Sequence, residues 1–320
     1  MDETVVEERI RAGSVGLRFA HARPPSARAT VVVLPGRGEF IEKYAETTGD
    51  LLARGFATAH VEWRGQGLSD RLLPLRDPGH INDYREYLED IRAALDRCKE
   101  LELPRPFIML AHSMGGQIGL RFLHDAPGEF AAAVMTAPMW GIRLKPLPFL
   151  VARMIAAAAV RLGAHSKYAP GQGAWQIARC VFEGNPLTGC PDRFELYRAL
   201  LETRPELALG GVTYGWLAAS LRSIALTRRP GYLEAIGTPV LVCQAALERI
   251  VCNRSQTELV RRLPKGRLVV FPDAQHEILI ERPPVRAHFF RELEGFLAET
   301  GALGPQQTSV PPGRLLAAAG

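Results

Sequence analysis

The sequence predicts an α/β protein with a mostly parallel central sheet, helices on both faces of the sheet and a helical insertion. Short, nearly continuous apolar runs alternate with amphipathic segments towards both ends of the chain. Apolar strands of this kind are typical of a parallel sheet that is buried on both faces. The middle of the chain instead shows helical patterns without a convincing strand. The 320 residues, 47% of them hydrophobic, are enough to bury a full core.

The first half of the core alternates strand and helix. Apolar runs ended by Pro, Gly or a polar turn predict strands, and apolar residues at three- and four-residue spacing predict helices. On this basis we predict strands over 29–36, 56–63, 107–112 and 130–138, and helices over 40–55, 81–101 and 115–127.

The second half of the chain carries the insertion and closes the core. We predict helices over 149–163, 175–182, 193–205 and 213–229, then strands over 239–245 and 267–272 and a helix over 285–300. The expected organisation is therefore a core formed by 1–139 and 231–300, with a helical cap, or lid, over 140–230 that covers the ligand-binding edge of the sheet. The segment 301–320 is rich in Pro, Gly and Gln and is expected to be a disordered tail.

Charge and cysteine content narrow the partners. The formal net charge of +5 is mild and no dense Lys/Arg run is present, so no nucleic-acid partner is expected. Transient contact with an anionic membrane surface stays open beside the simpler alternative of an ordinary polar surface. The five cysteines show no zinc spacing, so no metal is expected.

The compartment is expected to be the cytoplasm, with peripheral membrane contact as an alternative. The stretch MDETVVEERIRAG lacks the apolar region of a signal peptide. The most apolar segment, PLPFLVARMIAAAAVRLGAH, is interrupted by Arg153 and Arg161 and is too short to cross a bilayer. An odd number of cysteines without a leader suggests a reducing compartment.

Ser113 is the candidate nucleophile. In LAHSMGGQIGL it stands between a predicted strand and a predicted helix, which is the layout of the G-x-S-x-G nucleophile turn, although Ala111 replaces the first glycine. The alternative is a serine that caps an ordinary helix. Gly115 and Gly116 follow where strand, turn and helix are expected to crowd, and an alanine methyl group can fit at the first position.

A serine hydroxyl needs a base and an acid that orients the base. In sheets of this type the chain order is serine, acid, histidine, each beyond the carboxyl end of a strand. His276, in the loop after the strand 267–272, fits the base better than the other seven histidines. Glu248, after the strand 239–245, is the favoured acid, and Asp273 is its rival.

The oxyanion hole is expected to combine two backbone N–H groups. Met114, directly after the serine, supplies the first. Arg37 in LPGRGEF supplies the second, where Gly36 permits a tight turn. The Arg37 guanidinium has a further possible role, because it can bind a phosphate or carboxylate of the substrate.

The motifs LPGRGEFIEKY, EWRGQGLSDR, LAHSMGGQIGL, QAALERIVCN and AQHEILIE together resemble the α/β-hydrolase superfamily, and most of all its bacterial lysophospholipase and monoacylglycerol-lipase-like group. The resemblance runs from about residue 10 to 298. It implies a serine hydrolase with Ser113 as nucleophile, Glu248 as acid, His276 as base and the Arg37 and Met114 amides as oxyanion donors. The sequence departs from the common pattern at Pro35, Ala111 and Glu248, where many relatives have His, Gly and Asp.

The expected function is hydrolysis of a lipid monoester, either a lysophospholipid or a monoacylglycerol, through an acyl-enzyme and without a cofactor. A small-ester esterase or an aminopeptidase would use the same fold, which alone does not discriminate between substrates. An alternative of another class is a catalytically silent binding protein, although such proteins usually lose the serine or the histidine. The oligomeric state, chain length and headgroup preference do not follow from the sequence.

Overall fold

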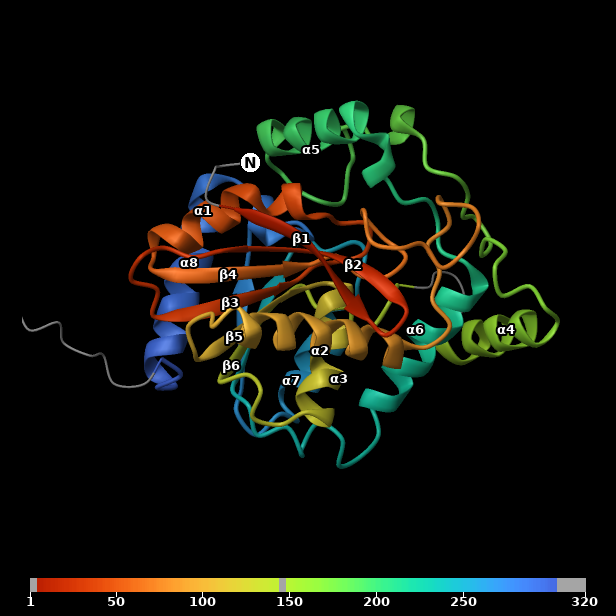
Figure 1. The fold of residues 1–320 in the computed structure, drawn as a ribbon. Coiled ribbons are helices and arrows are strands. Elements are labelled where there is room, and N and C mark those ends of the chain that lie inside the picture. The colour runs from red at the N-terminus through yellow and green to blue at the C-terminus, as the bar shows by residue number, and fades with distance from the viewer. Residues whose placement is uncertain (1–4, 144–147, 304–320) are drawn as a thin grey trace, which may run out of the picture.

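The computed structural model describes residues 5–143 and 148–303, which are built around one eight-stranded sheet (Figure 1). The strand order is β1-β2-β4-β3-β5-β6-β7-β8. The pairs from β4 to β8 are parallel, whereas β1–β2 and β2–β4 are antiparallel. The predicted α/β class is confirmed. The strands are β1 (Val6–Ala12), β2 (Val15–Ala22), β3 (Ala29–Leu34), β4 (Phe56–Val61), β5 (Phe107–His112), β6 (Ala132–Thr136), β7 (Val240–Ala245) and β8 (Gly266–Phe271).

Helices cover both faces of the sheet because its strands are apolar on both sides. In β3, Val32 and Leu34 belong to one buried cluster, and the alternating Val31 and Val33 belong to another. The first cluster includes side chains of α2, α3, α6 and α7, and the second includes side chains of α1 and α8. The helices are α1 (Ala45–Ala53), α2 (Tyr84–Glu100), α3 (Met114–Asp125), α4 (Phe149–Arg161), α5 (Pro191–Thr203), α6 (Tyr214–Thr227), α7 (Asn253–Val260) and α8 (Pro283–Glu299).

The N-terminal hairpin of β1 and β2 was not among the predicted strands. The β1 sequence VEERIRA has few β-branched or aromatic residues, and only Ile10 and Ala12 are buried. Charged side chains of this kind are common on edge strands, where they discourage pairing with other chains. The connection turns at Gly13, whose φ is +63°.

The segment between β6 and β7 contains α4, α5 and α6 and, in its described residues, no strand of the sheet. The predicted helix over 175–182 is wrong, since only the short 3-10 turn Ile177–Arg179 forms there. Trp175 and Ile177 pack instead against the small cluster of Phe40 and Leu207, and Asp77 accepts a hydrogen bond from the Trp175 N–H at 3.0 Å. Tertiary contacts therefore override the local pattern.

The three helices of this segment relate differently to the rest of the molecule. α5 lies over one edge of the structure in Figure 1, and α4 lies beside α6 on its outer side. α6 packs on α2 and α3, with Tyr84 Oη 2.9 Å from Ser220 Oγ and Gln117 Nε2 donating to Ser223 Oγ at 2.9 Å. The division into core and cap stays a prediction, and the expected tail lies outside the described residues from 304 onwards.

None of the helices in the described part of the chain combines the length and apolarity that crossing a bilayer requires. The α4 helix nevertheless exposes Leu150, Met154 and Ile155, whose exposed fractions are 61%, 57% and 44%. In the described residues its contacts with other helices are mainly with α6.

Candidate active site

Ser113 stands at a sharp turn between β5 and α3. Its φ of +48° is rare for a residue with a side chain, and such strain is normally kept where a function needs it. The turn is held by the Ser113 N–H, which donates to Thr136 O at 3.0 Å, and by the Ser113 carbonyl, which accepts from Gly116 and Met139. The Ser113 side chain makes no helix-capping hydrogen bond. The Ser113 hydroxyl therefore does not cap α3.

Close packing explains the glycines of the turn. A Cβ at Gly115 would lie 2.2 Å from Leu34 O, and a Cβ at Gly116 would lie 2.6 Å from Pro138 Cβ. Ala111 is completely buried in β5 and pairs with Leu34 and Met135 on the neighbouring strands. A methyl group thus fits at the first position of the motif, whereas the two positions after the Met114 amide have no space for one.

His276 and Glu248 reach Ser113 from the ends of two neighbouring strands. His276 lies in the loop after β8, and its Nε2 is 3.0 Å from Ser113 Oγ. The other ring nitrogen, Nδ1, is 2.6 Å from Glu248 Oε2, in the loop after β7. Asp273 is exposed, and within the described residues it makes no hydrogen bond to His276. The three side chains therefore form one continuous hydrogen-bonded chain, in which Asp273 takes no part.

Backbone groups orient the Glu248 carboxylate. Its Oε1 accepts hydrogen bonds from the N–H groups of Ile250 at 2.6 Å and Val251 at 3.1 Å, which leaves Oε2 for His276. The side chain is buried. Burial alone would raise the pKa of Glu248, but the hydrogen bonds from His276 and the two amides lower the pKa below its ordinary value. Glu248 is therefore held as a carboxylate beside the imidazole.

The turn that carries Arg37 presents one free N–H between two engaged ones. The Gly36 N–H donates to Glu39 Oε2, and the Gly38 N–H donates to Gln66 Oε1 at 2.7 Å. Neither the Arg37 N–H nor the Met114 N–H has a hydrogen-bond acceptor among the described residues. Two unpaired amides at this place have the chemistry of an oxyanion hole.

A buried cation joins the Arg37 turn to the His276 loop. Lys43 Nζ donates to Glu39 Oε1 at 2.9 Å and to Glu277 Oε1 at 2.6 Å. Glu39 also accepts from Tyr44 Oη at 2.5 Å. Burial would raise the pKa of Glu39, but Lys43, His112 and Tyr44 lower this pKa to about 2. Burial raises the pKa of Glu277. Sequence reasoning missed these residues, although the i, i+4 spacing of Glu39 and Lys43 was a visible signal.

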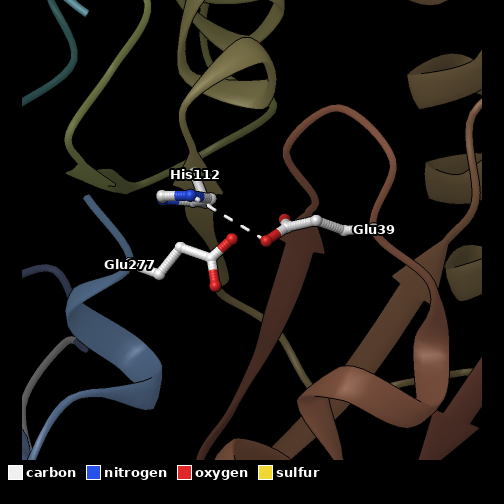
Figure 2. Close-up of side chains that lie close together, drawn as sticks. All are labelled: Glu39, His112 and Glu277. Carbon is white, nitrogen blue, oxygen red and sulfur yellow. Dashed lines mark ion pairs between the residues drawn. The ribbon is translucent and has the colours of Figure 1, made fainter. Parts of the chain in front are cut away.

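Glu39, His112 and Glu277 form a cluster of the kind that can bind a metal ion, as Figure 2 shows. His112 Nε2 is 3.9 Å from Glu39 Oε1. Burial lowers the pKa of His112 to about 4, so the ring is neutral at physiological pH, and its Nδ1 bonds Thr136. Since Lys43 already contacts both carboxylates, the cluster has its own cation and does not need a metal ion for charge balance.

A cavity of about 490 Å³ adjoins this site. Its walls come from the loop 171–187, from 209–211 and from α5, rather than from α4. Two of its wall residues are hydrogen-bonded to the loop that carries His276, called here the base loop. The His276 N–H donates to Pro186 O at 3.4 Å, and the Glu277 N–H donates to Leu187 O at 2.8 Å. Arg37 lines the cavity from the opposite loop. The volume is in the range of small-molecule sites.

The Arg37 guanidinium has few partners in this cavity. It donates from Nη2 to Gly210 O and lies 5.6 Å from the Trp216 ring, but its buried Nε has no hydrogen-bond partner in the described residues. No described carboxylate forms an ion pair with it. Burial lowers the pKa of Arg37 to about 10, so the group is still a cation at neutral pH. A half-buried cation without a carboxylate partner beside an open cavity is suited to an anionic ligand.

Known proteins resemble the chain over most of its length. The serine aminopeptidase S33 family model matches residues 25–283. Lysophospholipase L2 of Escherichia coli is 33% identical over 85% of this chain and 81% of its own length, and a probable lysophospholipase L2 of Haemophilus influenzae is 31% identical over 89% of both. The structure of a soluble variant of monoglyceride lipase from Saccharomyces cerevisiae has a TM-score of 0.71 at 17% identity, covering 92% of this chain and 94% of that one. The chain therefore belongs to the serine aminopeptidase S33 family of α/β-hydrolases.

Proposed function

We propose that the protein is a serine carboxylester hydrolase of lipid monoesters, with a lysophospholipid as its foremost substrate. The observation that carries the proposal is the hydrogen-bonded chain from Ser113 Oγ through His276 to Glu248 at the strained turn. The similarity to proteins named lysophospholipase L2 supports a lipid substrate.

The proposed mechanism is acyl transfer in two steps. Ser113 Oγ attacks the ester carbonyl while its proton passes to His276 Nε2, and the Arg37 and Met114 amides bind the oxyanion. As the tetrahedral species collapses, His276 gives that proton to the departing alcohol, which leaves an acyl-serine. Water then gives a proton to His276 and attacks the acyl-serine, and the fatty acid is released while the proton returns to Ser113. The Glu248 carboxylate stabilises the imidazolium in both steps.

Labelling with a fluorophosphonate tests the reactive serine. The folded wild-type protein is expected to be labelled at Ser113, and Ser113→Ala to remain unlabelled. Absence of labelling in the folded wild type would favour the silent binding protein over any hydrolase. This experiment is independent of the substrate.

The Arg37 guanidinium favours an ester that carries a phosphate, because it is a half-buried cation without a carboxylate partner at the edge of the cavity. The backbone donor of this residue survives truncation of its side chain. Arg37→Ala is therefore expected to lower kcat/KM for a lysophospholipid by roughly tenfold or more, while a monoacylglycerol of the same chain length changes less than about threefold. Equal losses on both esters would contradict phosphate recognition by Arg37.

A panel of lysophospholipids, monoacylglycerols and short nitrophenyl esters of matched chain length separates the remaining alternatives. Highest activity on a short ester would favour a small-ester esterase, and activity on aminoacyl arylamides alone would favour an aminopeptidase. The family description names the latter activity, whereas the curated relatives with the higher identity carry lipid-hydrolase names.

A further inference from the structure

A second cavity, of about 450 Å³, is lined by residues of α2, α3, α4 and α6 and not by Ser113. In Figure 1 these helices lie together, with α4 on the outer side of α6. The charged residues of its lining are mostly cationic, because five arginines stand against a single aspartate. They are Arg85, Arg121, Arg153, Arg222, Arg229 and Asp83.

The one acid that the described residues contribute to this lining is already engaged. Asp83 caps α2, accepts a hydrogen bond from the Arg85 N–H at 2.8 Å and pairs with the Arg85 side chain at 3.0 Å. Arg222 donates to the Asn82 carbonyl at 2.6 Å, which neutralises no charge. Within the described residues, Arg121, Arg153 and Arg229 form no ion pair. The cavity therefore concentrates positive charge that the chain itself does not balance.

Arg121 makes this cavity different from a solvated basic surface. Its side chain projects from the middle of α3 and is only 6% exposed. Its Nε is completely buried and has no hydrogen-bond partner among the described residues. Burying a guanidinium nitrogen without a hydrogen-bond partner costs free energy, and a hydrogen bond from this nitrogen to a ligand would offset that cost.

We propose that the cavity lined by Arg85, Arg121, Arg153, Arg222 and Arg229 binds a phosphate group of an anionic ligand, at a site separate from the Ser113 centre. A guanidinium binds phosphate oxygens through paired N–H donors, and several arginines around one pocket suit a multiply charged anion. The phosphate has two sources that the cavity chemistry does not separate, an anionic phospholipid headgroup and a soluble phosphate. The apolar side chains exposed on α4 next to Arg153 are compatible with the first source.

Binding to the full-length protein tests the proposal with two probes at constant ionic strength. Inorganic pyrophosphate is titrated by calorimetry, and vesicles of phosphatidylcholine with and without phosphatidylglycerol are used for cosedimentation. The test variant is Arg153→Gln with Arg222→Gln, because both side chains are exposed and the fold should survive. The matched control is Arg261→Gln with Arg291→Gln, which removes the same charge from exposed positions elsewhere.

The expected result is that the wild type and the control bind at least one probe, while the cavity variant binds it roughly tenfold more weakly or worse. Loss of pyrophosphate binding would identify a soluble phosphate as the source. Loss of vesicle binding that depends on phosphatidylglycerol, without pyrophosphate binding, would identify the lipid headgroup. No binding of either probe by the wild type, or equal losses in the cavity variant and the control, would overturn the proposal.

A stability measurement addresses Arg121 itself. Because the Nε of Arg121 is buried without a hydrogen-bond partner, Arg121→Met is expected to keep or raise Tm in the absence of phosphate and to abolish any increase of Tm caused by the bound probe. A clearly lower Tm without ligand would show that Arg121 serves the fold and would overturn its assignment to the site. Hydrolysis of a short soluble ester by the Arg153 and Arg222 variant should stay at the wild-type rate, which separates this site from the proposed function.

Discussion

Replacing Glu248 with Gln tests the proposed acid through the tautomer of His276. In the wild type, Glu248 Oε1 accepts from the Ile250 and Val251 amides, and Oε2 accepts from His276 Nδ1–H. A glutamine can keep its oxygen on the two amides, and its NH2 group then points at Nδ1. The imidazole would have to accept there and carry its proton on Nε2, which faces Ser113. The base would then hold a proton at the atom that must remove one.

The expected loss is large and confined to turnover. The alternative amide orientation would forfeit both backbone hydrogen bonds, each costing about 1 to 3 kcal/mol in a buried site. We therefore expect the unfavourable tautomer to dominate and kcat to fall by roughly 10³- to 10⁴-fold, which corresponds to about 4 to 5.5 kcal/mol of activation free energy. Nitrophenyl ester hydrolysis measures kcat, and thermal unfolding should give a Tm close to that of the wild type.

Asp273→Asn is the matched control for Glu248→Gln, because it removes a carboxylate from the same end of the sheet but from an exposed side chain without a hydrogen bond to His276. Its kcat should stay within about threefold of the wild type. Wild-type turnover in Glu248→Gln together with a collapse in Asp273→Asn would refute the assignment and transfer the acid role to Asp273.

Three further predictions concern the frame of the site. Gly115→Ala places a methyl group against a backbone carbonyl and should destabilise the protein by about 3 kcal/mol or more. The control Gly49→Ala adds a methyl group in open space on α1 and should stabilise the protein by about 0.5 to 1 kcal/mol. Urea unfolding measures both changes in the free energy of unfolding. Lys43→Met leaves Glu39 and Glu277 without their cation and should cost about 3 to 5 kcal/mol at pH 7 but less at acidic pH, where a carboxylate protonates; a smaller loss at pH 7 would contradict this. Because the pKa of Glu39 is lowered from 4.5 to about 2, the stability that it contributes is complete above pH 4.5 and is lost as the pH falls towards 2. Glu39→Gln should remove this part of the acid-dependent fall in unfolding free energy, and an unchanged pH profile would count against the lowered pKa.

Much of the sheet could be predicted because its strands are buried on both faces. A strand such as FIMLAH has no polar face, so it is visible as a short apolar run, and its length and flanking residues distinguish it from a helix. The β1 strand escaped because an edge strand rich in Glu and Arg has no such signature. The helix expected over 175–182 failed for another reason, since Trp175 gains more from packing against α5 and the Phe40 turn than from continuing a helix.

The proposed reacting groups could be located from the sequence because parallel strands bring their carboxyl ends to one edge. Ser113 and His276 are 163 residues apart, yet each follows a strand of the same sheet. The chain order and the positions of the strand ends were therefore sufficient to predict that these side chains lie close together, without knowledge of the loop conformations. The Lys43 network obeys no such rule, because its members come from a turn, a short helix and the base loop, and their contacts depend on loop conformations.

The turn at Gly36, Arg37 and Gly38 shows what this network contributes. The Glu39 and Gln66 side chains accept hydrogen bonds from the N–H groups of Gly36 and Gly38, so the N–H of this turn that stays free is that of Arg37. The same residue sends its side chain into the cavity, where it donates to the Gly210 carbonyl. A residue without a long side chain could supply the amide, but only an arginine or lysine would also bring a cation to the edge of the cavity. A preference for phosphate-bearing esters would therefore belong to the side chain of Arg37, and the chemistry of ester cleavage to its backbone, which is why Arg37→Ala can separate the two.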